Sequence, residues 1–326
     1  MSITSDNSNG ANVLVTGIGG FLAGHIALQL LKQGYRVRGS LRSIGTSAAT
    51  VGLLGAHTDG QLQNLSLVQA DLDSDGGWAA AVEGCDYVIH TASPFPPGYP
   101  ENANALIQTA RDGALRVLRE AHRAQVKRVV LTSSIAATNH GDGQAPFTEE
   151  NWTDPESPRA TPYYKSKTLT ERAAWAFAHE VGLDLAVINP STILGPLLGP
   201  NFGTSVGLIH HLMTGRFNGI PRFGFGFSGS RTLWPFLLIP FRTMPPACRH
   251  AKSLTRSSGS WRNPTPMHEP LFTSSIATSV SVQQKPTASS GGAHVQMSNA
   301  SAPAPKASST WDWCRPRMEN RQRDGQ

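Results

Sequence analysis

Three side chains have the types and spacing that suit the reduction of a carbonyl group: Ser134, Tyr163 and Lys167. This reaction takes a hydride and a proton for the developing alkoxide, and a phenol with an unperturbed pKa of about 10 ionises poorly near neutrality. A nearby ammonium group lowers the pKa of a phenol, and a serine hydroxyl can hold the carbonyl oxygen. Tyr163 and Lys167 are four residues apart in a helical stretch, so their side chains project from one face.

The setting of this pair makes the pattern specific. A lone Tyr-x-x-x-Lys is common by chance and ordinarily belongs to an exposed amphipathic helix. Here it comes about thirty residues after Thr132, Ser133 and Ser134, which end an apolar, strand-like run and lie downstream of a glycine-rich turn. The combination predicts a Ser-Tyr-Lys catalytic triad.

These residues need a scaffold, and the first two thirds of the chain alternate between apolar, β-rich runs and amphipathic stretches. Unbroken apolar strands that alternate with helices are typical of a parallel sheet covered on both faces. We therefore predict an α/β fold with a doubly wound parallel sheet of the Rossmann type. The predicted strands are 12–16, 35–41, 65–70, 86–90, 128–132 and 183–189, and the predicted helices are 21–33, 101–124 and 161–180.

A glycine-rich turn joins the first strand to the first helix. Gly17 permits the tight turn, Gly20 lets the backbone approach a pyrophosphate, and Ala23 is small enough for close packing of helix and strand. A pyrophosphate binds the free N–H groups at the start of such a helix. The alternative is a plain structural turn, but the strand-turn-helix setting predicts a dinucleotide site at Gly17, Gly19, Gly20, Phe21 and Leu22.

The end of the second predicted strand favours NADP over NAD. In this fold an acidic residue there binds the 2′-hydroxyl of NAD, whereas an arginine accommodates the 2′-phosphate of NADP. The sequence has Arg38 and Arg42 in this region and no acidic residue between positions 32 and 59. The alternative is that both arginines are solvated surface charges. Asp71 and Leu72, just after the third predicted strand, are placed to flank the adenine.

Six segments have a pattern known from one family: VLVTGIGGFLAGH, RVRGSLRS, HTASP, RVVLTSSIAA, YYKSKTLTERAAW and VINPSTILGP. They resemble the extended short-chain dehydrogenase/reductases of the NAD-dependent epimerase/dehydratase superfamily, in particular the dihydroflavonol 4-reductase and aldehyde reductase branch. The resemblance covers about residues 11–220. Ala23 departs from the usual third glycine of that family, with Gly24 beside it.

The resemblance implies roles for further residues. It implies that Ser134, Tyr163 and Lys167 are the triad of an enzyme that reduces an aldehyde or ketone to an alcohol with NADP. It also implies that Arg42 meets the 2′-phosphate. The remaining implied contacts are Thr91, Ala92 and Ser93 along the cofactor, Asn189, Pro190 and Ser191 beside the nicotinamide, and Asn139 toward a small-molecule substrate.

The composition of this 326-residue chain excludes several classes of protein. No apolar run approaches the roughly 18–20 residues of a membrane span, and the polar start MSITSDNSNGAN does not resemble a secretory signal. Three scattered cysteines form neither a disulfide framework nor a zinc site, and His210-His211 lacks carboxylate or cysteine partners nearby. We expect no metal, no membrane partner, and a cytoplasmic monomer or homodimer.

The formal net charge of +6 arises from basic residues near the end of the chain. Residues 228–326 contain 12 Lys/Arg and 4 Asp/Glu, whereas residues 1–227 have a net charge of −2. The tail neither clusters its basic residues nor interleaves them with aromatics, so we expect no nucleic-acid partner. We predict a disordered N-terminus at 1–10, an NADP-binding domain with the start of a small, incomplete substrate lobe at 11–227, and an anomalous basic, low-complexity, disordered tail at 228–326.

Three other functions stay open at this point. A nucleotide-sugar epimerase or dehydratase belongs to the same superfamily, although the segments HTASP and VINPSTILGP favour a carbonyl reductase. A regulator that senses the cofactor would bind NADP without chemistry, and it would not need the triad. A defective product would keep the cofactor half, lack a complete substrate lobe and turn over slowly or not at all.

We hypothesise that residues 228–326 are translated out of frame, because helical periodicity and the family pattern end near Phe227 and acidic residues are rare beyond it. If so, one of the other two reading frames of the coding DNA is expected to encode, from codon 228 onward, an acidic polypeptide segment with strand and helix patterns. Sequencing the gene around that codon and translating all frames checks this. If neither of the other frames restores such a continuation, the tail is a natural basic extension.

Overall fold

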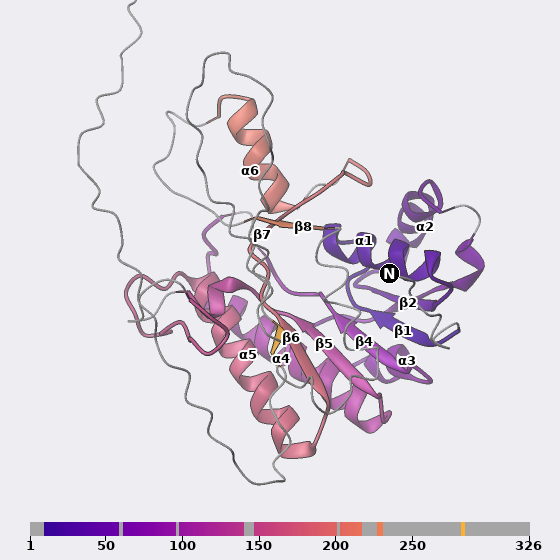
Figure 1. The fold of residues 1–326 in the computed structure, drawn as a ribbon, viewed down its shortest axis with the longest axis horizontal. Coiled ribbons are helices and arrows are strands. Elements are labelled where there is room, and N and C mark those ends of the chain that lie inside the picture. Colours follow the sequence, from indigo (N-terminus) through magenta and orange to yellow (C-terminus); the bar gives the residue numbers. More distant parts are fainter. Residues whose placement is uncertain are drawn as a thin grey trace, which may run out of the picture. The chain divides into compact units, whose positions relative to one another are not determined.

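The computed structural model describes residues 10–58, 61–95, 98–139, 147–200, 203–216, 227–230 and 282–283. Its centre is a sheet with the strand order β3-β2-β1-β4-β5-β6-β9, in which β9 is antiparallel to β6 and all other pairs are parallel (Figure 1). The strands of this sheet are β1 (Asn12–Val15), β2 (Arg36–Leu41), β3 (Leu65–Gln69), β4 (Tyr87–His90), β5 (Arg128–Thr132), β6 (Leu185–Ile188) and β9 (Val282–Gln283). A second, two-stranded sheet pairs β7 (Thr192–Leu194) in parallel with β8 (Phe227–Gly229).

Helices connect these strands. They are α1 (Phe21–Lys32), α2 (Ser47–Gly55), α3 (Trp78–Val82), α4 (Ala103–Arg123), α5 (Pro162–Val181) and α6 (Thr204–Met213), with 3-10 turns η1 (Ile44–Thr46), η2 (Gln61–Asn64) and η3 (Ile135–Ala137). Within the described part of the chain, none of them is long and apolar enough to cross a membrane.

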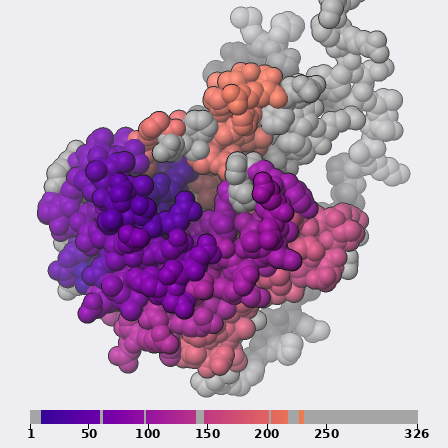
Figure 2. All heavy atoms as spheres, turned by 180° about the vertical axis from the view of Figure 1, so that it is seen from behind, coloured from indigo at the N-terminus to yellow at the C-terminus, as the bar shows by residue number. Residues whose placement is uncertain are grey.

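Both faces of the sheet are buried, because successive side chains of each strand point to opposite sides. In β1, Val13 and Val15 join a core with residues of α1 and α2, whereas Leu14 joins a second core with residues of α3, α4 and α5. Figure 1 shows these helices on the two sides of the sheet, and the same segments form one continuous surface in Figure 2. Two-sided burial explains why the strands are apolar at nearly every position.

The ends of α5 are encoded by its local sequence. The Thr161 hydroxyl accepts a hydrogen bond from Tyr164 N, and Pro162 occupies the first turn, where its missing N–H costs nothing. The helix ends at Gly182, whose φ of +70° lies in the left-handed region that favours glycine. These boundaries place Tyr163 in the first turn and Lys167 one turn later.

The doubly wound parallel sheet predicted from the sequence is confirmed, and the predicted strands lie within two residues of the observed ones. The sequence analysis missed α2 and α3. Both are short, and α2 contains Thr50, Val51 and Gly52, which are weak helix formers. Parallel strands of one sheet nevertheless require a crossover connection, so a helix was to be expected between β2 and β3 and between β3 and β4.

The pairing of β7 with β8 continues past residue 227. Ser191 Oγ and Ser228 Oγ lie 2.9 Å apart, and Ser230 N donates to Leu194 O at 2.7 Å. Ser228 and Ser230 are both buried, so the packed part of the chain extends at least to residue 230. The predicted N-terminal segment 1–9 and most of the predicted tail lie outside the described residues.

A substitution of Gly39 tests how tightly the glycine turn packs on β2. A Cβ at this position would lie 2.4–2.8 Å from three side-chain atoms of Ile18, so Gly39→Ala is expected to destabilise the fold by about 1–3 kcal/mol. Gly52→Ala is the matched control, because Gly52 is exposed in α2 with no atom within 4 Å of its Cβ position. The control is expected to stabilise by about 0.5–1 kcal/mol. Urea unfolding of both variants measures the difference, and equal free energies of unfolding would contradict the packing described.

Candidate active site

The predicted site residues lie after the carboxyl ends of the six parallel strands. The strand order reverses between β1 and β4, and in open α/β sheets ligands bind at the carboxyl edge beside such a reversal. The structure thus brings the glycine turn after β1, the residues after β4 and the serine after β5 to one edge of the sheet.

The glycine turn fits a dinucleotide pyrophosphate. Gly17 has a φ of +65°, and a Cβ there would lie 3.1 Å from the Ala92 side chain, so only glycine suits both the conformation and the space. Gly19 and Gly20 are exposed. Gly20 caps α1 with no side-chain hydrogen bond, and the first turn has no acidic residue. The N–H groups at the start of α1, including those of Phe21 and Leu22, therefore form a suitable anion site.

Two hydroxyl groups that the sequence analysis missed hold this turn in place. Ser40 Oγ accepts from Gly17 N at 3.1 Å. Thr16 Oγ1 accepts from the backbone N–H groups of Thr91 and Ala92, each at 3.0 Å, and lies 2.8 Å from His90 Nδ1. Since Thr16 Oγ1 already accepts twice, its own hydrogen is directed to His90 Nδ1. Thr91 and Ala92 are thus beside the turn as predicted, with their N–H groups bonded to Thr16.

The two arginines that favoured NADP have different surroundings. Arg42 is exposed directly after β2, where the sequence analysis expected it. Arg38 donates instead to Ala80 O, Ala81 O and Glu83 O at the end of α3, at 2.6–3.1 Å. Arg38 therefore satisfies carbonyl groups that α3 leaves unpaired, and only Arg42 stays a candidate for a 2′-phosphate.

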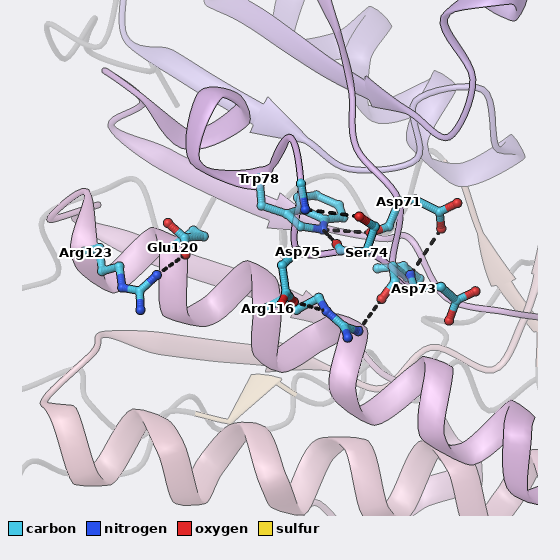
Figure 3. Close-up of polar contacts among 10 residues, drawn as sticks. Asp71, Asp73, Ser74, Asp75, Trp78, Arg116, Glu120 and Arg123 are labelled. Atoms are coloured by element: carbon cyan, nitrogen blue, oxygen red, sulfur yellow. Dashed lines mark hydrogen bonds and ion pairs between the residues drawn. The ribbon is translucent and has the colours of Figure 1, made fainter.

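Asp71 and Leu72 lie in a loop after β3 that is held from two sides (Figure 3). The Trp78 indole donates to Asp71 O at 2.9 Å and to Ser74 O at 3.1 Å. Arg116 donates to Leu72 O at 2.6 Å and also bonds the Asp75 carboxylate. These contacts fix the backbone of the two residues at the carboxyl end of β3, the position predicted to flank an adenine.

Ser134 and Tyr163 meet at the end of β5. Ser134 caps η3, with its Oγ accepting from Ala136 N at 3.1 Å, and its hydroxyl also hydrogen-bonds the phenol of Tyr163. Lys167 is 8% exposed, and its Nζ donates to Thr132 O at 3.4 Å. The three predicted catalytic residues therefore all lie near the carboxyl end of β5.

The pKa of the tyrosine moves against our expectation. Burial raises the pKa of Tyr163 to about 12, and the hydrogen bond from Ser134 opposes this only in part. Burial likewise lowers the pKa of Lys167 to about 8, opposed by the negative charge of Glu171. Because the pKa of Lys167 is itself lowered, this lysine is already neutral in the pH range in which Tyr163 ionises, and the expected fall in the pKa of Tyr163 does not occur.

The predicted residues after β6 lie beside Ser134. Asn189 is fully buried, and its Nδ2 donates to Ser134 O at 3.0 Å. Pro190 O accepts from Ile135 N at 3.1 Å, and Ser191 contacts β8 as described above. Asn139, the predicted substrate contact, follows η3, and its N–H donates to Ile135 O at 3.0 Å.

Two further residues at this site were not predicted. Glu171 is buried and accepts hydrogen bonds from Ser133 and Asn189. Its position four residues after Lys167 on one helix face was the available signal. Phe95, after β4, packs edge-on against Tyr163 with ring centroids 4.6 Å apart and is 47% exposed. Ser93, the third predicted residue after β4, lies two positions before it and is half-buried.

Comparisons with known proteins agree with this geometry. Residues 13–226 match the NAD dependent epimerase/dehydratase family. Cinnamoyl-CoA reductase CAD2 of Medicago truncatula is 34% identical over 253 residues, which are 76% of this chain and 77% of that protein. Dihydroflavonol 4-reductase of Zea mays is 34% identical over 215 residues, which are 64% of this chain and 60% of that protein.

Solved structures have the same fold. The yeast methylglyoxal/isovaleraldehyde reductase Gre2, complexed with NADPH, has a TM-score of 0.61 and 28% identity, covering 71% of this chain and 74% of that one. Vestitone reductase from alfalfa has a TM-score of 0.58 and 27% identity, covering 72% of this chain and 74% of that one. The chain thus belongs to the NAD dependent epimerase/dehydratase family, as an extended short-chain dehydrogenase/reductase similar to the dihydroflavonol reductases.

Proposed function

We propose that this chain is an NADP-dependent oxidoreductase that reduces an aldehyde or ketone to an alcohol. The observation that carries the proposal is the hydrogen bond between Ser134 and Tyr163, with Lys167 one helical turn away, at the sheet edge that also carries the glycine turn. Relatives named as reductases of cinnamoyl-CoA and dihydroflavonol support the reduction of a carbonyl group, and the Gre2 structure with NADPH supports the cofactor.

The cofactor-binding side of the proposal uses backbone groups and one arginine. The turn at 17–20 and the start of α1 would hold the pyrophosphate, Arg42 the 2′-phosphate, and the loop at 71–72 the adenine. Residues 91–93 and 189–191 would line the nicotinamide half. When bound, NADPH supplies the hydride.

The proton comes from the protein. With a pKa of about 12, Tyr163 keeps its proton at neutral pH. It can donate this proton to the alkoxide, because an alkoxide is a stronger base than a phenolate. The Ser134 hydroxyl lies within reach of the same phenol and would hold the carbonyl oxygen of the substrate. Lys167 would stabilise the phenolate that remains after proton donation, because a nearby ammonium favours the ionised form.

The proposed cofactor preference is tested at Arg42. Arg42→Ser is expected to weaken NADPH binding about tenfold or more, because a charge-assisted hydrogen bond to a phosphate is worth roughly 1.5–3 kcal/mol. NADH affinity is expected to stay the same, since NADH lacks that phosphate. Arg119→Ser, at an exposed site on α4, is the matched control. Titration calorimetry with both cofactors gives the affinities, and equal affinity of the unmodified chain for NADPH and NADH would contradict the preference.

The proposed proton donor is tested at Tyr163. The chain is expected to oxidise NADPH slowly with methylglyoxal or isovaleraldehyde, because we expect part of the substrate pocket to come from the segment after residue 227, where the family pattern is lost. Tyr163→Phe is expected to lower this rate by about 100-fold or more, whereas Tyr164→Phe, at the neighbouring phenol, should retain it. Absorbance at the NADPH band measures the rate. An unchanged rate in Tyr163→Phe contradicts the proposed mechanism, and rapid turnover by the full chain contradicts the impaired pocket.

A further inference from the structure

A single buried carboxylate joins three elements of the site. Glu171 is 1% exposed, and three groups donate to it: Ser133 Oγ at 2.5 Å, Asn189 Nδ2 at 2.7 Å and Trp175 Nε1 at 3.4 Å. These donors come from the end of β5, the end of β6 and the next turn of α5. Burial raises the pKa of Glu171, and the three donated hydrogen bonds oppose this rise because they favour the ionised form.

Lys167 is the counter-charge of this carboxylate. It lies one helical turn before Glu171 and interacts with it electrostatically, and its Nζ donates to the last carbonyl of β5. A buried ammonium group is costly unless an opposite charge compensates it. In the described part of the chain, the other titratable group that interacts with Lys167 is His90 at the end of β4. Burial lowers the pKa of His90 to about 3, so its ring is neutral.

Asn189 links the same carboxylate to the catalytic serine. Its Nδ2 donates both to Glu171 Oε2 and, at 3.0 Å, to Ser134 O. The orientation of the Asn189 amide is therefore set by Glu171 on one side and by the Ser134 backbone on the other.

We propose that Glu171 is a positioning residue whose carboxylate keeps Lys167 protonated in the buried site and holds Asn189 against the backbone of Ser134. The inference rests on the proposed function only for the use of Lys167 in catalysis, because the electrostatic interaction between these two buried residues of α5 is independent of turnover. Burial lowers the pKa of Lys167 to about 8 while Glu171 raises it, so removal of the carboxylate leaves a lysine that loses its proton at a lower pH.

The protonation of Lys167 can be followed directly in the full chain without cofactor. The chain is labelled with 13C at the lysine Cε, the Lys167 signal is assigned by its loss in Lys167→Met, and its shift is titrated with pH. Glu171→Gln is expected to lower the titration midpoint of Lys167 by about one pH unit or more. Glu180→Gln, exposed at the far end of the same helix, should leave the midpoint unchanged. An unchanged midpoint in folded Glu171→Gln overturns the proposal.

A second variant covers the case in which Glu171→Gln does not fold. Glu171→Asp keeps the negative charge but moves it one methylene farther from Lys167. The titration midpoint of Lys167 in this variant is therefore expected to fall by a smaller amount than in Glu171→Gln. A midpoint at or above that of the unmodified chain overturns the proposal. Where turnover is measurable, the pH above which kcat falls should move down with the midpoint, and an unmoved pH profile overturns the positioning role. A shifted midpoint in a chain without any turnover contradicts the proposed function and supports the electrostatic interaction between Glu171 and Lys167.

Discussion

The turn at residues 17–20 fits between the ends of β2 and β4 with almost no free space, and the cofactor side of the site depends on this fit. The left-handed Gly17 approaches Ala92, and the Ile18 side chain fills the space that Gly39 leaves in β2. Ser40 and Thr16 add hydrogen bonds to the same two neighbours. Because the turn is held from both sides, the start of α1 has a defined direction, and its N–H groups face the carboxyl edge of the sheet. Larger side chains at these glycines would displace the backbone on which a pyrophosphate would rest.

The proposed catalytic half of the site depends on polar groups that are largely buried. Electrostatic interactions are stronger there than in solvent, and an uncompensated charge is costly. Glu171 and Lys167 compensate each other, while Tyr163 stays protonated and bonded to Ser134. The site thus has a proton donor and a positive charge before a substrate arrives. Phe95 adds an apolar surface beside the phenol, suited to an apolar part of a substrate.

Much of this was predictable from the sequence, and the failures have physical causes. The sheet, the glycine turn and the triad follow from local patterns: apolar runs, glycines between a strand and a helix, and a Tyr-x-x-x-Lys spacing. Arg38 and Arg42 are equivalent in a linear sequence, and only the position of α3 distinguishes them. The pKa of Tyr163 depends on burial and on the Ser134 hydroxyl beside it, and both are tertiary properties. Glu171 is a buried acid on an otherwise ordinary helix, so its importance becomes visible only with Ser133 and Asn189 beside it.

Direct observation of hydride transfer decides whether the site performs the proposed reaction, even if turnover is slow. The full chain is incubated with an aldehyde and with NADPH that carries deuterium at C4 of the nicotinamide, on either face, and the alcohol is examined by deuterium NMR. We predict deuterium on the carbinol carbon from one of the two labelled cofactors, and none from the Tyr163→Phe variant. Tight binding of NADPH with no deuterium in any tested alcohol from either label would contradict the proposal and favour a protein that binds the cofactor without reducing carbonyl groups.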